Sequence, residues 1–147
     1  MDVHEVNDLV AKGVSALEND HVHLALVCFE RAAEIEMSPK VCSGLGYCIA
    51  AARGELARGE QLCRGAIERD PETVFHYRNL GSVLLLAGNR GEAIQTFRQG
   101  LRHGKDAVII TKMDDLGTRK PPVITSLPRN HFLNRMLGLM LNRVGFR

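Results

Sequence analysis

The sequence predicts an all-α chain built from repeated helix pairs, and three observations carry that prediction. Small residues recur with a period of 34, at Ala25, Gly59 and Ala93. Aromatic residues make up only 5% of the chain, with no Trp, so aliphatic and Ala side chains must build the core, which favours helices. With 147 residues, 45% of them hydrophobic and 24% charged, the chain has the composition of a single folded domain and not of a disordered or collagen-like polymer.

Further series of residues share this period. The positions four and seven residues after each small residue are Phe29, Cys63 and Phe97, and Ala32, Ala66 and Gly100. Upstream, a glycine recurs at Gly13, Gly46 and Gly81 with spacings of 33 and 35. The unequal spacing indicates one extra residue between the two helices of the second unit. A fixed period over three units is the sequence signature of a repeat architecture.

Helix boundary signals place six helices near residues 5–18, 21–36, 39–53, 56–69, 72–87 and 90–103. Ser38-Pro39 and Asp70-Pro71 each have the pattern of an N-cap followed by proline at the first helical position, where the missing N–H costs nothing. Turn residues separate the two helices of each unit, at Asn19-Asp20, at Gly54 and at Gly88-Asn89.

Taken together, these residues resemble the tetratricopeptide repeat (TPR), a helix–turn–helix unit of 34 residues, over roughly residues 6–105. The resemblance implies three helix pairs within residues 1–105, stacked in a right-handed superhelix, an α-solenoid. Small residues would let the two helices of a pair approach closely, with Gly13 facing Ala25 in the first unit. Phe29 and Phe97 would fill the gaps between units, with Cys63 as a smaller filler. Each pair buries little alone, so stacking supplies the core.

The pattern changes after residue 105. Residues 106–118 are expected to form a short capping helix that ends near Gly117, and the charge at Asp115 argues against a complete fourth repeat. Residues 119–147 form a proline-led basic amphipathic tail: Pro121-Pro122 forbids helix, and the apolar run 132–141 has helical spacing. The tail from Arg119 onward is similar to those of small bacterial TPR proteins.

Charge is divided unevenly along the chain. Residues 1–101 carry 10 Lys/Arg against 14 Asp/Glu, a net charge of −4, whereas residues 102–147 carry 9 against 3, a net charge of +6. This asymmetry indicates an anionic partner or an internal contact, or merely reflects the drift of surface charge. We expect the tail to pack against the repeats, either capping the last pair or covering the groove, with a membrane surface as the alternative.

No catalytic, cofactor or metal site is expected from the motifs. The six histidines are scattered and are assigned to the surface by default, and the four cysteines lack the Cys-x-x-Cys spacing of zinc and redox sites and are expected to be buried free thiols. Gly44-Leu45-Gly46 lacks the third glycine of a dinucleotide site, and no phosphate loop or nucleophile elbow is present. The sequence therefore predicts a protein that is not an enzyme.

The resemblance implies a working surface on the concave face, lined by the first helix of each unit. The residues carried over to this partner-binding groove are Asn7, Val10, Val14, Leu17, Lys40, Tyr47, Phe75, Arg78 and Ser82. Tyr47 and Phe75 would be anchors and Arg78 an orienting charge, whereas Leu85 and Leu86 are assigned to the core. The carboxylate clamp known in this family needs a basic residue and an Asn where this chain has Val10 and Val14, so that use is rejected.

The leading functional hypothesis is a cytoplasmic adaptor without chemistry or cofactors, which binds an apolar helix or extended peptide in the groove. The alternative is a small chaperone that holds an apolar segment of a secreted or membrane-active client. A third hypothesis is attachment of the tail to a membrane surface or nucleic acid, of which nucleic acid is not expected. The chain is expected to be a monomer or a weak homo-oligomer.

Overall fold

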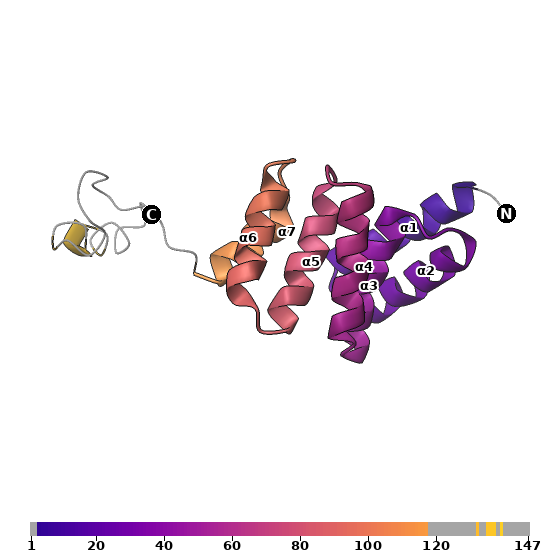
Figure 1. The fold of residues 1–147 in the computed structure, drawn as a ribbon, viewed down its shortest axis with the longest axis horizontal. Coiled ribbons are helices and arrows are strands. Elements are labelled where there is room, and N and C mark those ends of the chain that lie inside the picture. Colours follow the sequence, from indigo (N-terminus) through magenta and orange to yellow (C-terminus); the bar gives the residue numbers. More distant parts are fainter. Residues whose placement is uncertain (1–2, 118–131, 133–134, 138, 140–147) are drawn as a thin grey trace. The chain divides into compact units, whose positions relative to one another are not determined.

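The computed structural model describes residues 3–117, 132, 135–137 and 139, and seven helices are defined within residues 3–117 (Figure 1). They are α1 (Val3–Glu18), α2 (Val22–Ile35), α3 (Pro39–Arg53), α4 (Leu56–Arg69), α5 (Val74–Leu86), α6 (Arg90–Leu101) and α7 (Ala107–Asp115). No strand occurs among the described residues. The first six helices form three helix-turn-helix pairs, and the predicted all-α repeat solenoid is confirmed.

The chain divides into two compact units, residues 1–114 and 115–147. Nearly all of α7 belongs to the first unit, together with the three helix pairs. Most of the expected tail lies outside the described residues, including its proline-led segment. Within residues 132–139 the described positions are helical, and the side chains of Phe132, Met136 and Leu139 are exposed.

Local capping explains where α3 begins and ends. The Ser38 hydroxyl accepts a hydrogen bond from the Val41 N–H at 3.4 Å, and Pro39 occupies the first helical position as predicted. At the other end Gly54 has φ 71°, in the left-handed region where a Cβ is unfavourable. The interpretation of Asp70-Pro71 as a second such start is wrong, because α5 begins three residues after Pro71, at Val74.

Asp70 instead ends α4, and its carboxylate accepts a hydrogen bond from the Thr73 hydroxyl at 2.6 Å. The Tyr77 hydroxyl donates to the Pro71 carbonyl at 2.6 Å. These two bonds hold residues 70–73 in a turn. The helix therefore does not begin at Pro71.

Aromatic rings fill the space that the repeated glycines leave. A Cβ added to Gly13 would lie 2.9 Å from the Phe29 ring, and one added to Gly44 in the next unit would also overlap that ring. Phe29 therefore bridges the first and second units, as predicted. Gly13 lies against the Phe29 ring, and Gly81 lies in the same way against Phe97. In the second unit two small residues meet, where a Cβ on Gly46 would lie 2.7 Å from the Gly59 carbonyl oxygen.

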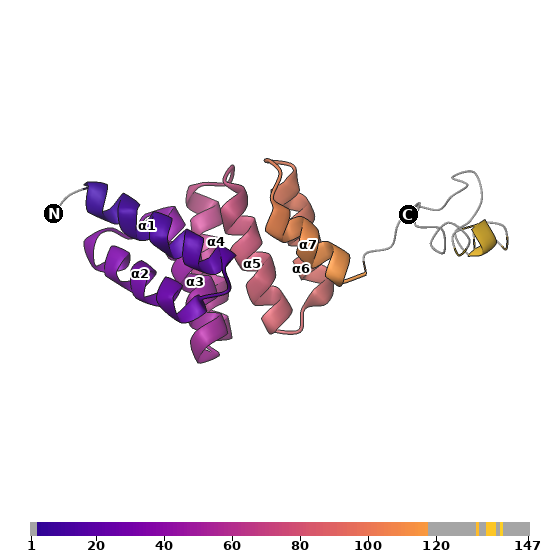
Figure 2. The ribbon, with the colours of Figure 1, turned by 180° about the vertical axis from the view of Figure 1, so that it is seen from behind.

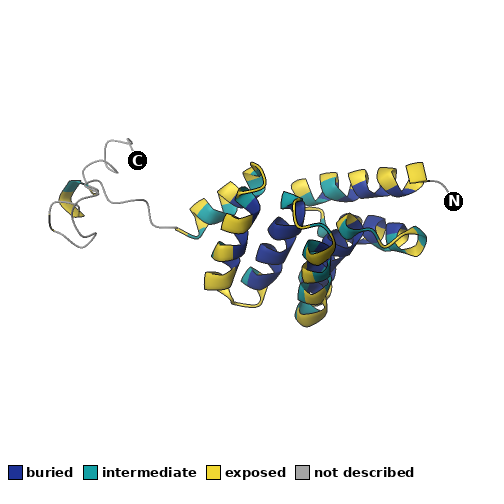
Figure 3. Cartoon of the chain, turned by 45° about the horizontal axis from the view of Figure 1, so that its top comes forward, coloured by how far each residue is buried: buried dark blue, intermediate teal, exposed yellow. Residues whose placement is uncertain are grey.

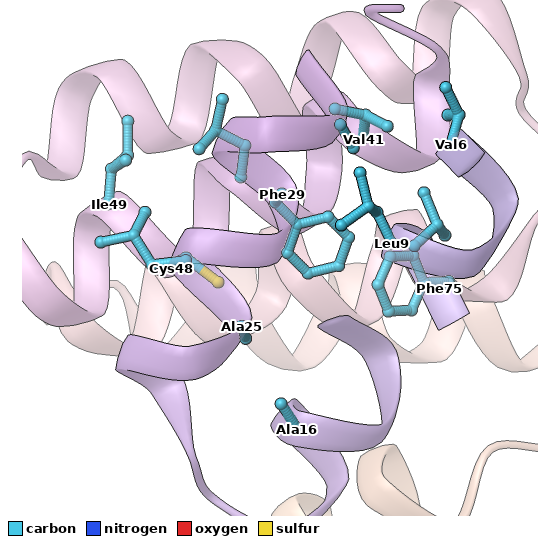
Figure 4. Close-up of a cluster of buried hydrophobic side chains, with 13 residues drawn as sticks. Val6, Leu9, Ala16, Ala25, Phe29, Val41, Cys48, Ile49 and Phe75 are labelled. Carbon is cyan, nitrogen blue, oxygen red and sulfur yellow. The ribbon is translucent and has the colours of Figure 1, made fainter. Parts of the chain in front are cut away.

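The hydrophobic core extends from the first unit into α5. Its members, drawn as sticks in Figure 4, are Val6, Leu9, Val10, Ala16, Ala25, Leu26, Phe29, Ala32, Val41, Leu45, Cys48, Ile49 and Phe75. Helix α5 is buried at every position from 75 to 84 (Figure 3), because it packs against α3 and α4 of the second pair and against α6 of its own pair. The assignment of Leu86 to the core is wrong: its side chain is 49% exposed, whereas Leu84 is fully buried.

Helix α7 lies beside α6 (Figures 1 and 2) and starts with a cap from Asp106, whose carboxylate accepts a hydrogen bond from the Ile109 N–H at 3.0 Å. Ile109 is fully buried, and a Cβ added to Gly100 of α6 would lie 3.4 Å from its Cδ1 atom. The predicted short helix after the third pair is thus present.

Candidate functional site

Helices α1, α3, α5 and α7 together line one hollow with an empty volume of about 360 Å³, including its open mouth. Its lining residues are Leu17, Glu18, Asp20, Tyr47, Arg78, Asn79, Ser82, Val108 and Lys112. These helices are the first helices of the three pairs and the helix that follows them. The hollow thus lies on the face that the repeat pattern predicts for a partner.

Arg78 forms part of the rigid wall of this hollow. Its guanidinium lies over the Phe75 ring, 4.8 Å from the ring centroid, and Nη1 donates to the Asp106 carboxylate at 3.4 Å. Arg78 and Asp106 are both largely buried in this ion pair. Because α5 supplies the arginine and the start of α7 the aspartate, the pair fixes α7 against the third unit. A ligand would meet a cation whose position is already set.

Tyr47 and Lys112 supply the polar groups that are free to act. Both side chains are half-buried, and neither has a hydrogen bond or ion pair among the described residues. Burial raises the pKa of the Tyr47 hydroxyl, which stays protonated as a donor at neutral pH. Two exposed carboxylates, of Glu18 and Asp20, lie on the same rim. The hollow can therefore pair with polar groups of either sign, beside the apolar side chains of Leu17 and Val108.

The sequence-predicted groove residues fall into two groups. Leu17, Tyr47, Arg78 and Ser82 come together in the hollow. The others do not line it: Asn7 and Lys40 are exposed elsewhere, Val14 is half-buried against the core, and Val10 and Phe75 belong to the core, at 9% and 8% exposure. Phe75 offers no free ring to a partner, since Arg78 covers one face of it.

Sequence reasoning missed Asp20, Asn79, Val108 and Lys112. The signal for Lys112 is the period itself, because Lys112 lies 34 residues after Arg78 and Val108 lies 34 residues after Val74. Treating residues 106–118 only as a cap hid this fourth contribution to the groove.

A Ser–His–Asp chain lies where the second and third units meet, and Asn79, which lines the hollow, contacts it. The Ser43 Oγ atom is 2.8 Å from His76 Nδ1, and His76 Nε2 is 3.2 Å from the Asp70 carboxylate. Asn79 also donates to Ser43 Oγ at 3.4 Å. Ser43 and His76 are fully buried, so no substrate reaches the hydroxyl, and the chain holds helices together. The assignment of all six histidines to the surface is wrong for His76.

The four cysteines, Cys28, Cys42, Cys48 and Cys63, are buried and unbridged, as predicted. Burial raises the pKa of Cys48 to about 12 and raises that of Cys63 further, so neither forms a thiolate at neutral pH. Among the described residues, no group of His, Cys, Asp and Glu has an arrangement that could hold a metal ion. No helix in that part of the chain is long and apolar enough to cross a bilayer.

No family model and no curated protein matches the chain, but solved structures do. The first TPR of Spaghetti (RPAP3) bound to the HSP90 peptide SRMEEVD is similar at a TM-score of 0.60, with 13% identity over 80% of this chain and 96% of that one. The TPR domain of Sgt2 from Aspergillus fumigatus has a TM-score of 0.55, with 17% identity over 89% of this chain and 93% of that one.

YrrB, described as a TPR protein with an unusual peptide-binding site, also has a TM-score of 0.55, with 19% identity over 75% of this chain and 57% of that one. At these identities the likeness concerns the fold, and it does not test the bacterial subtype expected from the tail. The helix pairs, their 34-residue period and these structures together show that the chain has the tetratricopeptide-repeat fold.

Proposed function

We propose that this protein is an interaction module that holds a peptide segment of a partner protein in the hollow between α1, α3, α5 and α7. It is proposed to do so in the cytoplasm, without chemistry of its own. Similar structures with the same fold include one bound to a short peptide and one described as having a peptide-binding site, which supports this class of function.

The observation that carries the proposal is the pair of unpartnered polar groups in the hollow. The Tyr47 hydroxyl and the Lys112 ammonium point to a ligand acceptor, such as a carboxylate or a backbone carbonyl. Leu17 and Val108 supply apolar contact beside them. The proposed ligand is thus a segment with an apolar side chain flanked by an acceptor, either extended or helical.

Affinity capture from the native cell, followed by titration of the captured partner's binding segment, tests this proposal. Replacing Tyr47 with Ala should weaken binding by about tenfold or more, as loss of an aromatic contact at the centre of an interface does. Lys112→Gln should weaken binding less than Tyr47→Ala does, and its effect should be larger at low salt than at high salt. Lys40→Gln is the matched control, because Lys40 is exposed outside the hollow.

Equal affinities for the wild type and the Tyr47→Ala variant would place the working surface elsewhere. Tyr47 is half-buried, so thermal unfolding of each variant must show that the fold is intact. The chaperone alternative requires a captured client that is insoluble alone and stays soluble only with this chain. A partner that folds independently would instead support the adaptor role.

A further inference from the structure

Helix α2 carries two large apolar side chains in solvent, one helical turn apart. Leu24 is 56% exposed and Val27 is 52% exposed. Both lie on the side of α2 that turns away from its own core residues, Ala25, Leu26 and Phe29. Neither residue contributes to the hydrophobic core of the first unit.

The other two units show that the fold does not require apolar residues there. One period after Leu24 the chain has Arg58, and two periods after it Glu92. The positions that correspond to Val27 are Gln61 and Gln95. All four of these residues are polar: Arg58 is basic, Glu92 is acidic, and Gln61 and Gln95 are uncharged. Arg58, Gln61, Glu92 and Gln95 are exposed, as expected for solvent-facing positions. Only the first unit presents apolar groups at these positions, so Leu24 and Val27 have a role that the repeat itself does not explain.

Beside Leu24 lies a hollow of about 880 Å³ that is open to solvent, between α1 and α2. Its lining residues are Ala11, Lys12, Ser15, Ala16, Asn19, His21, Leu24 and Cys28. One unit later the place of Ala11 is taken by Gly44, against which the Phe29 ring of the preceding unit lies. Ala11, by contrast, is exposed.

We propose that this face, defined by Leu24, Val27 and the hollow beside them, associates with the same face of a second copy of the chain. A two-fold contact uses one patch twice, so the patch must contain both a projecting group and a place to receive it. In the proposed contact, Leu24 and Val27 of one copy project toward the hollow of the other copy. This contact is separate from the peptide-binding groove and does not depend on it.

Charges of both signs lie at this face. Lys12 lines the hollow, Asp8 lies one turn before it on α1, both are exposed, and neither forms an ion pair with any described residue. At the corresponding positions the second unit has the buried apolar residues Val41 and Leu45. In the proposed two-fold contact, the Asp8 of one copy pairs with the Lys12 of the other, and the reverse.

Sedimentation equilibrium of the full chain under reducing conditions tests the proposal. The wild type should shift between the 16.2 kDa monomer and a dimer of twice that mass as concentration rises. For so small a patch, the dissociation constant should be on the order of 10 µM. The double substitution Leu24→Arg and Val27→Gln introduces the residues that the second unit already has. It should raise that constant at least tenfold while the helical circular dichroism and the melting temperature stay unchanged.

Leu86→Gln is the matched control, because Leu86 is equally exposed but lies on α5. It should leave association unchanged. Lys12→Glu should weaken association about threefold, and adding Asp8→Lys to it should restore the wild-type constant. A wild type that stays monomeric up to about 200 µM, or a double variant that dimerises normally, would overturn the proposal.

Discussion

The two junctions between the helix pairs are held together by different chemistry. Where α3 meets the first pair, Phe29 fills the space over Gly44, and among the residues that the structure describes no buried side-chain hydrogen bond crosses the contact. Where α5 meets the second pair, Ser43, His76 and Asp70 form a hydrogen-bonded chain through the interior. The interior of the first junction is apolar, with an exposed Arg53–Glu30 ion pair of 2.7 Å at its edge. The second junction combines apolar packing with a buried polar chain.

This difference shows that the repeat does not determine which interactions hold neighbouring pairs together. The position of His76 in the third unit corresponds to Val41 in the second and Asp8 in the first. The apolar junction should respond to changes of volume and not to pH. The polar junction should respond to protonation, because its hydrogen bonds depend on neutral His76.

The largest effect is expected from emptying the first junction. Phe29 is fully buried and touches glycines of two units, so Phe29→Ala leaves a cavity that cannot collapse easily. We expect a loss of about 3–5 kcal/mol in the free energy of unfolding, measured by urea denaturation. Leu86→Ala, at a half-exposed position, should cost less than about 1 kcal/mol. Similar costs for the two variants would contradict the central place of Phe29.

Overfilling the same junction should cost somewhat less. A Cβ at Gly44 would overlap the Phe29 ring, so Gly44→Ala must displace the ring or the helix, at about 1–3 kcal/mol. Gly65→Ala is the control, since a Cβ there meets no atom within 4 Å and alanine favours helix. Gly65→Ala should therefore stabilise the protein by roughly 0.5–1 kcal/mol. If both substitutions stabilise it, the junction is looser than the structure shows.

The second junction should weaken as the pH falls. Burial lowers the pKa of His76, although the carboxylate of Asp70 opposes this shift, and the positive charge of Lys40 adds to it. The unfolded chain takes up a proton near pH 6.5, whereas the folded chain does so only at lower pH. The contribution of neutral His76 to the free energy of unfolding is therefore fully present above about pH 6.5. It is lost as the pH falls below that value, with a slope of at most about 1.4 kcal/mol per pH unit.

Chemical denaturation at pH 7.5 and at pH 5.5 measures this slope. His76→Gln should reduce the slope although it lowers stability at both pH values. His103→Gln is the matched control, because His103 is exposed and stacks on Tyr77 without a buried hydrogen bond. The low pKa of Asp70, caused mainly by the Thr73 hydrogen bond, keeps that carboxylate ionised throughout this range. A slope that His76→Gln leaves unchanged would assign the pH dependence to other groups.

The period located the helices, and tertiary contacts account for what it missed. Small and aromatic residues at fixed spacing predicted the three pairs because such residues are what close helix contacts require. The start of α5 was misplaced because Asp70-Pro71 has the local pattern of a cap, whereas the turn is set by Tyr77, six residues from its acceptor Pro71. Ser43 and His76 are 33 residues apart, so no local pattern joins them.

The candidate site was predictable only in part, for the same reason. Tyr47 and Arg78 follow from the repeat register, but the burial of Phe75 depends on contacts that Arg78 and the first unit make. The 34-residue period could have predicted Lys112, since Lys112 lies one period after Arg78. The Arg78–Asp106 ion pair, which fixes α7 beside the hollow, exists only in the folded chain.

The smallest effect is expected at the solvent-exposed edge of the second junction, where an ion pair joins α4 to α6. Arg64 contacts Glu92 at 2.5 Å and Glu60 at 2.8 Å, and these carboxylates raise the pKa of its guanidinium. All three side chains are roughly one third to one half exposed, so water and salt screen the attraction. Glu92→Gln should thus cost only about 0.2–1 kcal/mol in 50 mM salt, and about nothing in 1 M salt.

Denaturation of both proteins at the two salt concentrations measures that difference. A cost above about 2 kcal/mol, or one that salt does not reduce, would mean that Glu92 is part of a desolvated network like that of His76. A small, salt-sensitive cost would instead assign the polar contribution at the second junction to its buried side chains. The exposed Arg64–Glu92 pair would then add little to stability, although its contact is shorter than the one between Ser43 and His76. The cost of losing a polar partner depends on burial more than on distance.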